Sequence, residues 1–122
     1  MYEIKINPTK NRLYLLFGEM NRDELIMVIQ DIERECQKLI SGFDCITVFQ
    51  EGKIITHLDE DLLCMVQEVV FRYGIRRVVR VVGKAEDLGR RQLERLAIQA
   101  EYPVEYAETT EDAERMLDTP RE

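Results

Sequence analysis

Residues 21–49 read NRDELIMVIQDIERECQKLISGFDCITVF, a helical pattern followed directly by a strand pattern. Asn21 with Glu24 three residues later is typical of a helix N-terminus. Apolar residues then recur at helical spacing, and they are Leu25, Val28, Ile29, Ile32, Cys36, Leu39 and Ile40. We expect this helix to end near Ile40, where a Ser-Gly pair follows. The β-rich run over residues 43–49 then predicts a strand.

The alternation of helix and strand continues on both sides of this stretch. Residues 2–6 alternate apolar and polar side chains, and residues 13–17 are apolar throughout, which predicts a hairpin. We expect further helices over residues 59–73 and 85–100 and from Thr109 or Thr110 onward, and further strands over residues 75–82 and 104–106. Gly74 is expected to cap the helix that precedes it.

The resulting order, ββαβαβαβα, predicts a single α/β domain over residues 1–122, with a core over 2–117 and a short tail over 118–122. Helices that follow strands one at a time imply a mixed, mostly parallel sheet packed by helices, with the first strand antiparallel. We expect the second and third strands inside the sheet and the strand at residue 104 at an edge.

Composition narrows the function classes. The 122 residues are 45% hydrophobic and 34% charged, which suits one globular domain. Three cysteines without a CxxC pair and a single histidine, His57, indicate neither a disulfide framework nor a zinc site, so we expect no metal or cofactor. Nucleotide-binding and nucleophile motifs are missing, which predicts a protein that is not an enzyme. A polar–apolar alternation at the N-terminus and short apolar runs lead us to expect a cytoplasmic protein without a membrane partner.

Charge is distributed unevenly along the chain. Residues 101–122 hold eight acids and two arginines, a net charge of −6, whereas residues 72–95 hold eight bases and three acids, a net charge of +5. We expect the acidic segment to fold near the basic block, the alternative being that residues 72–95 bind an anion or a nucleotide. Nucleic acid is not expected as a partner, because the total charge is −7 and aromatic residues are missing between Lys84 and Gln99.

The helix over residues 59–73 has two different faces. Leu62, Val66, Val69, Val70 and Tyr73 fall on one side and predict a core face, with Leu63 at its margin. Phe71 and Cys64 fall instead with Glu60 and Gln67 on the opposite side. One exposed aromatic residue needs no functional explanation, but an exposed apolar strip can also mark a contact surface.

The element order, a hairpin that opens in Tyr-x-Ile and the ending Thr-Thr-Glu-Asp-Ala-Glu-Arg-Met-Leu resemble the STAS domain, the family of anti-sigma factor antagonists and sulfate-transporter tails. The resemblance covers about residues 2–117. In the family, Asp-Ser-Ser-Gly-Leu begins the second helix, and a partner kinase phosphorylates its second serine. The corresponding residues here are Asp59-Glu60-Asp61-Leu62-Leu63, which place Asp61 at the serine position.

The resemblance implies a bacterial protein-interaction module that is not switched by phosphoserine. Asp61 has no hydroxyl group, and Thr56 carries the nearest one in the sequence. The three acids at the start of this helix have three readings: they complement the helix dipole, Asp61 replaces a phosphoserine, or two of them form a catalytic pair.

We therefore expect a partner-binding surface that comprises Asp61, Leu63, Cys64, Gln67 and Phe71. The resemblance implies a kinase or a sigma-factor regulator as the partner. The alternatives are a structural or self-associating role, as in a homodimer, and an anion-binding role of residues 72–95.

Overall fold

The computed structural model describes residues 1–50, 57–82, 94–95, 97–98 and 100–119. Its elements, in chain order, are β1 (Tyr2–Asn7), β2 (Arg12–Phe17), α1 (Arg22–Cys36), β3 (Asp44–Phe49), α2 (His57–Arg72), β4 (Arg77–Val81), β5 (Val104–Ala107) and α4 (Thr110–Asp118). The prediction of an α/β fold is confirmed. The expected helix over residues 85–100 and the basic side chains on it lie largely outside the described residues, although residues 94–95 and 97–98 are helical.

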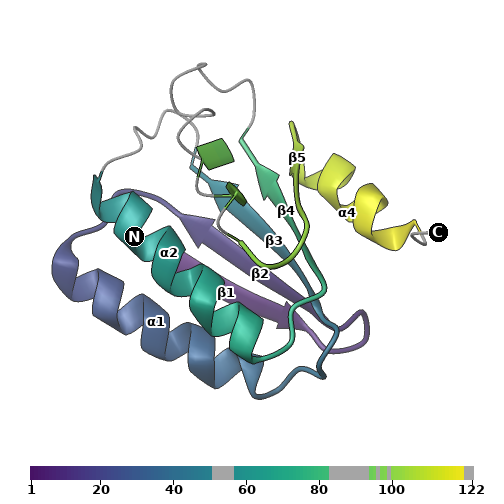
Figure 1. The fold of residues 1–122 in the computed structure, drawn as a ribbon, viewed down its shortest axis with the longest axis horizontal. Coiled ribbons are helices and arrows are strands. Elements are labelled where there is room, and N and C mark those ends of the chain that lie inside the picture. Colours follow the sequence, from purple (N-terminus) through teal and green to yellow (C-terminus); the bar gives the residue numbers. More distant parts are fainter. Residues whose placement is uncertain (51–56, 83–93, 96, 99, 120–122) are drawn as a thin grey trace.

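The strands form one five-stranded sheet in the order β1-β2-β3-β4-β5 (Figure 1). β1 pairs with β2 antiparallel, and each of the other neighbouring pairs is parallel. The predictions that the first strand is antiparallel, that the second and third strands lie inside the sheet, and that residue 104 lies in an edge strand are therefore confirmed.

Helices cover both faces of the sheet. α1 and α2 pack against each other on one face, and α4 packs against β3, β4 and β5 on the other (Figure 1). Because side chains alternate along a strand, Leu13, Leu15 and Phe17 of β2 join the core under α1 and α2. Ile46 of β3 and Val79 of β4 form a second cluster with Ala113 and Leu117 of α4.

Local sequence patterns predicted most of the helix ends correctly, but not the end of α1. The Asn21 side chain accepts a hydrogen bond from the backbone N–H of Glu24, and the Glu24 side chain accepts one in return, as predicted. Gly74 has φ +92 after α2, and Thr109 caps α4. The predicted end of α1 is wrong, because the helix stops at Cys36 and Ile40 is 75% exposed.

A long-range contact explains the early end of α1. The Asn11 side chain accepts a hydrogen bond from the Ile40 backbone N–H and donates one to its carbonyl oxygen, both at 2.9 Å. These bonds hold Ile40 against the β1–β2 turn, so its backbone is not available to a continuing helix.

Among the described residues, the acidic C-terminal segment pairs with the basic block and with a second basic region near the start of β2. Glu114 and Asp118 of α4 form ion pairs with Lys10 and Arg12 at the start of β2. Within residues 72–95, Arg77 pairs with Glu105 of β5 at 2.7 Å. The expectation is therefore borne out in part, because β5 and α4 lie against β4, which belongs to residues 72–95, while α4 also reaches Lys10 and Arg12.

Candidate protein-interaction surface

The outer side of α2 carries exposed apolar side chains. Phe71 is 47% exposed, Met65 is 38% exposed, and Cys64 is exposed as a free thiol. The prediction that Phe71 and Cys64 lie outside the core is confirmed. Leu62, Val66, Val69 and Val70 are buried, as their helical spacing predicted.

The neighbouring helix adds apolar residues that the sequence analysis missed. Ile26 of α1 is 58% exposed and Met27 is 54% exposed. The sequence could have indicated their exposure, because neither residue belongs to the helically spaced series Leu25, Val28, Ile29 that faces the core. We call the exposed group Ile26, Cys64, Met65 and Phe71 the docking surface.

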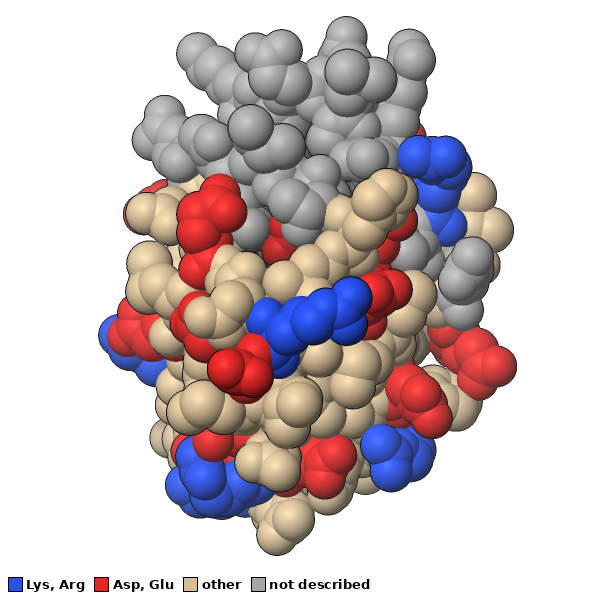
Figure 2. Space-filling model, turned by 90° about the vertical axis from the view of Figure 1, so that its left-hand side faces the viewer, with Lys and Arg blue, Asp and Glu red and all other residues tan. Residues whose placement is uncertain are grey.

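A pocket of about 440 Å³ lies between the first turns of α1 and α2, and we call it the α1–α2 pocket. Its lining comprises Arg22, Leu25, Ile26, Leu58, Asp61, Cys64 and Met65. The end of the molecule where α1 and α2 begin faces the viewer in Figure 2, and uncharged side chains extend across it between scattered charged groups. Asp61 therefore lies beside apolar surface rather than in an acidic cleft.

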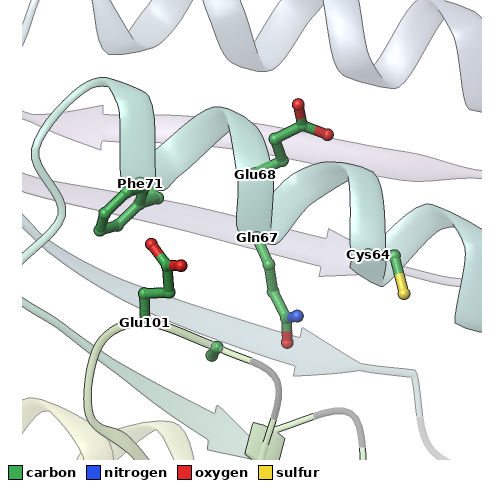
Figure 3. A pocket seen from close by; sticks show the side chains of 6 residues that line it. Cys64, Gln67, Glu68, Phe71 and Glu101 are labelled. Atoms are coloured by element: carbon green, nitrogen blue, oxygen red, sulfur yellow. The ribbon is translucent and has the colours of Figure 1, made fainter.

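A second pocket of about 260 Å³ lies between α2 and the segment that leads into β5, and we call it the α2 pocket. Its lining comprises Cys64, Gln67, Glu68, Phe71, Ala100 and Glu101. Figure 3 shows Gln67 pointing from α2 toward the segment that carries Glu101. Cys64 contributes to both pockets, so they adjoin along one helix.

Two of the five residues predicted for the partner surface are not exposed. Leu63 is 2% exposed and belongs to the core, so its place on a contact surface is wrong. Gln67 is 8% exposed, because its amide oxygen accepts a hydrogen bond of 2.7 Å from buried Arg80. Its helical position suggested solvent, whereas a partner from β4 determines its burial. Gln67 still lines the α2 pocket.

The first turn of α2 differs from the arrangement that we expected. The helix begins at His57, so Asp59 and Glu60 lie in its first turn and Asp61 follows them. Asp59 is 3% exposed, whereas Asp61 is exposed, so the two carboxylates point to different sides of the helix. Asp59 and Asp61 therefore do not face each other as a carboxylate pair. Thr56 lies outside the described residues.

The basic block does not form a continuous surface over its described part. Arg77 and Arg80 are buried on opposite faces of the sheet, as alternate residues of a strand require when three positions separate them. Arg76 donates two hydrogen bonds to Asp44, at 2.9 and 2.8 Å. Arg77 and Arg80 are therefore engaged inside the fold, whereas Arg76 is half exposed and pairs with Asp44.

Two buried thiols and one hydrogen-bonded tyrosine have raised pKa values. Burial raises the pKa of the Cys36 and Cys45 thiols to about 12, so both behave as small apolar residues. A hydrogen bond to Asp31 raises the pKa of Tyr2 to about 12. In the described part of the chain, no group of three or more histidine, cysteine or acidic residues is placed to hold a metal ion.

The chain matches no protein-family model, no curated protein and no solved structure in comparisons with each. Over the described residues, no helix is both long enough and apolar enough to cross a bilayer.

Proposed function

We propose that this protein is a non-enzymatic regulatory module of the STAS type that binds a protein partner through the docking surface. The observation that carries the proposal is the exposure of Ile26, Met65 and Phe71 around two adjoining pockets. Apolar side chains gathered around a hollow are typical of contact surfaces, whereas single exposed apolar residues are ordinary.

The position of Asp61 bears on how the proposed interaction would be regulated. Asp61 borders the α1–α2 pocket, next to Ile26 and Met65 of the docking surface. A carboxylate has one negative charge and cannot accept a phosphoryl group at a hydroxyl, so phosphorylation at this position would not switch the interaction. A kinase or a sigma-factor regulator would be the partner class.

The first experiment identifies the partner. Capture with the full chain from the native cell, followed by mass spectrometry, should recover a kinase-like protein or a sigma-factor regulator, which is then purified and mixed with this protein. Copies of the same chain as the only binder would favour self-association instead. A binder that requires residues 72–95 and not the docking surface would favour the anion-binding alternative.

The second experiment tests the surface itself by calorimetry with the purified partner. Ile26→Asp and Met65→Asp should each weaken binding about tenfold or more, because each places a charge in a desolvated contact. Ile40→Asp is the matched control, since Ile40 is 75% exposed and lies beyond α1, away from both pockets. Equal binding by all three variants would refute the proposed surface.

A further inference from the structure

We propose that the α2 pocket binds an arginine side chain that the partner presents, so that the partner's cation lies between the Phe71 ring and the Glu101 carboxylate. This inference rests on the proposed function, because the docked partner supplies the arginine. It adds a polar specificity site to the apolar docking surface.

The charge of the pocket favours a cation. Among the described residues that line it, two are carboxylates, Glu68 and Glu101, and none is basic. Within the described residues, neither carboxylate is in an ion pair with Lys, Arg or His. Figure 3 shows the Glu101 carboxylate pointing toward the Phe71 ring, whereas Glu68 projects from the other side of α2. Glu101 is therefore the carboxylate that would meet the ligand, and Glu68 adds negative potential at the rim.

The aromatic ring favours a guanidinium over other cations. Phe71 is 47% exposed, so its ring is accessible. A cation within about 6 Å of a ring centroid is attracted by the negative face of the ring, and arginine uses this contact more often than lysine. A planar guanidinium can stack on the ring while its N–H groups donate to a carboxylate beside it.

Gln67 forms the floor of the pocket and separates it from a buried cation. Its amide oxygen accepts a hydrogen bond of 2.7 Å from Arg80, which is 2% exposed on the inner side of α2. That bond fixes the side chain, which Figure 3 shows directed toward the segment carrying Glu101. A fixed floor lowers the entropic cost of binding because little has to be ordered.

The size of the pocket selects a single side chain. Sites for drug-sized ligands have volumes of about 300 to 1,000 Å³, and the α2 pocket has about 260 Å³. A nucleotide would exceed that space, and the lining carboxylates would repel its phosphates. An arginine projecting from a protein surface fits both the volume and the charge.

The test uses a probe that needs no knowledge of the partner. Titration of the full chain with N-acetyl-arginine methylamide should shift the backbone amide NMR signals of Phe71, Ala100 and Glu101 in a saturable way. The neutral citrulline analogue should shift them little, since it has the same shape without the charge. Equal shifts with both probes would overturn the proposal.

Three variants localise the effect. Glu101→Gln should weaken binding of the arginine probe about two- to fivefold, as should Phe71→Leu, which keeps an apolar side chain but removes the ring. Glu108→Gln makes the same charge change at an exposed residue outside the pocket and should bind like the parent protein. Weakening by Glu108→Gln to the same extent would show a general charge effect and overturn the site. The proposed function is tested separately, because Ile26→Asp and Met65→Asp should weaken binding of the partner but not of the arginine probe. Neither residue lines the α2 pocket.

Discussion

Arg12 is a buried cation at the start of a central strand, and it joins segments that are more than a hundred residues apart. It donates hydrogen bonds to Glu114 at 2.7 Å and to Asp118 at 3.1 Å. Burial alone would lower the pKa of Arg12, but these two bonds raise it above its ordinary value. A buried charge costs free energy unless it is paired, so the acids of α4 are what make this position tolerable.

Removing the Arg12 side chain should therefore lower the stability of the folded protein. We expect Arg12→Ala to lower the free energy of unfolding by about 2 to 4 kcal/mol, because it removes the cation that Glu114 and Asp118 bond and a long apolar stem. Lys38→Ala is the control, since Lys38 is 55% exposed in a pair with Glu35 on the surface. That variant should change stability by less than about 0.5 kcal/mol in urea denaturation. Similar small losses in both variants would contradict the role given to Arg12.

Gln67 illustrates a residue whose environment the sequence does not reveal. Its side chain lies four residues after buried Leu63 and three before buried Val70, yet its amide group suggested solvent. Its amide oxygen accepts a hydrogen bond from Arg80, which explains why a polar side chain stands at this buried position.

Replacing Gln67 shows whether the hydrogen bond to Arg80 contributes more to stability than an apolar side chain of similar size would at this position. Gln67→Leu should destabilise the protein by about 1 to 3 kcal/mol although it adds apolar surface, because Arg80 loses a hydrogen-bond acceptor inside the core. Gln67→Glu keeps an acceptor at the same place and should lose less. Urea denaturation of both variants decides between these effects, and greater stability of Gln67→Leu would show that the hydrogen bond is dispensable.

At the scale of elements, the helices and strands of the described chain were predictable because their apolar periods are strong. Two kinds of feature were not. The end of α1 depends on Asn11, from the β1–β2 turn, and the burial of Gln67 depends on Arg80, from β4. Both are contacts between separate elements. The candidate site was predictable to the extent that helical geometry places Phe71, Cys64 and Ile26 outward, whereas the place of Glu101 beside Phe71 required the packed structure.

The β1–β2 turn depends on both the side chain and the backbone conformation of Asn11. Asn11 has φ 54, and its side chain bonds twice to Ile40. We expect Asn11→Ala to lower the free energy of unfolding by about 2 to 3 kcal/mol, because it loses both hydrogen bonds and disfavours the left-handed backbone. Asn11→Gly restores the backbone freedom and should recover about 1 kcal/mol. Identical stabilities of the two variants would show that backbone conformation contributes nothing at this turn.

At the scale of the whole molecule, the two faces of the sheet are held in different ways. α1 and α2 cover one face with a continuous apolar core. α4 covers part of the other with a small apolar cluster and an ionic border in which Glu114 meets Tyr14 and Arg12, and Asp118 meets Arg12 and Lys10. The attachment of α4 should therefore respond to pH in a way that the α1–α2 face does not.

The direction of that response follows from the two carboxyl groups. Burial alone would raise the pKa of Glu114, but hydrogen bonds from Tyr14 and Arg12 lower it below its ordinary 4.5. The hydrogen bond from Arg12 lowers the pKa of Asp118 below its ordinary 3.8. Groups whose pKa is lower in the folded state add stability above their unfolded pKa, and this stability is lost as the pH falls through their folded pKa.

We therefore expect the free energy of unfolding to be constant with respect to these two groups near neutral pH and to fall once the pH drops below about 4.5. Glu114→Gln removes one of the two titrations, so its stability should be lower than that of the parent at pH 7 and should decline less steeply in acid. Urea denaturation at pH 7, 4.5 and 3.5 measures both slopes, with Glu108→Gln as a control for net charge. Because Glu108 is exposed and precedes α4, that control should keep the slope of the parent protein. An unchanged slope in Glu114→Gln would mean that the bonds of Glu114 to Tyr14 and Arg12 contribute nothing to the attachment of α4.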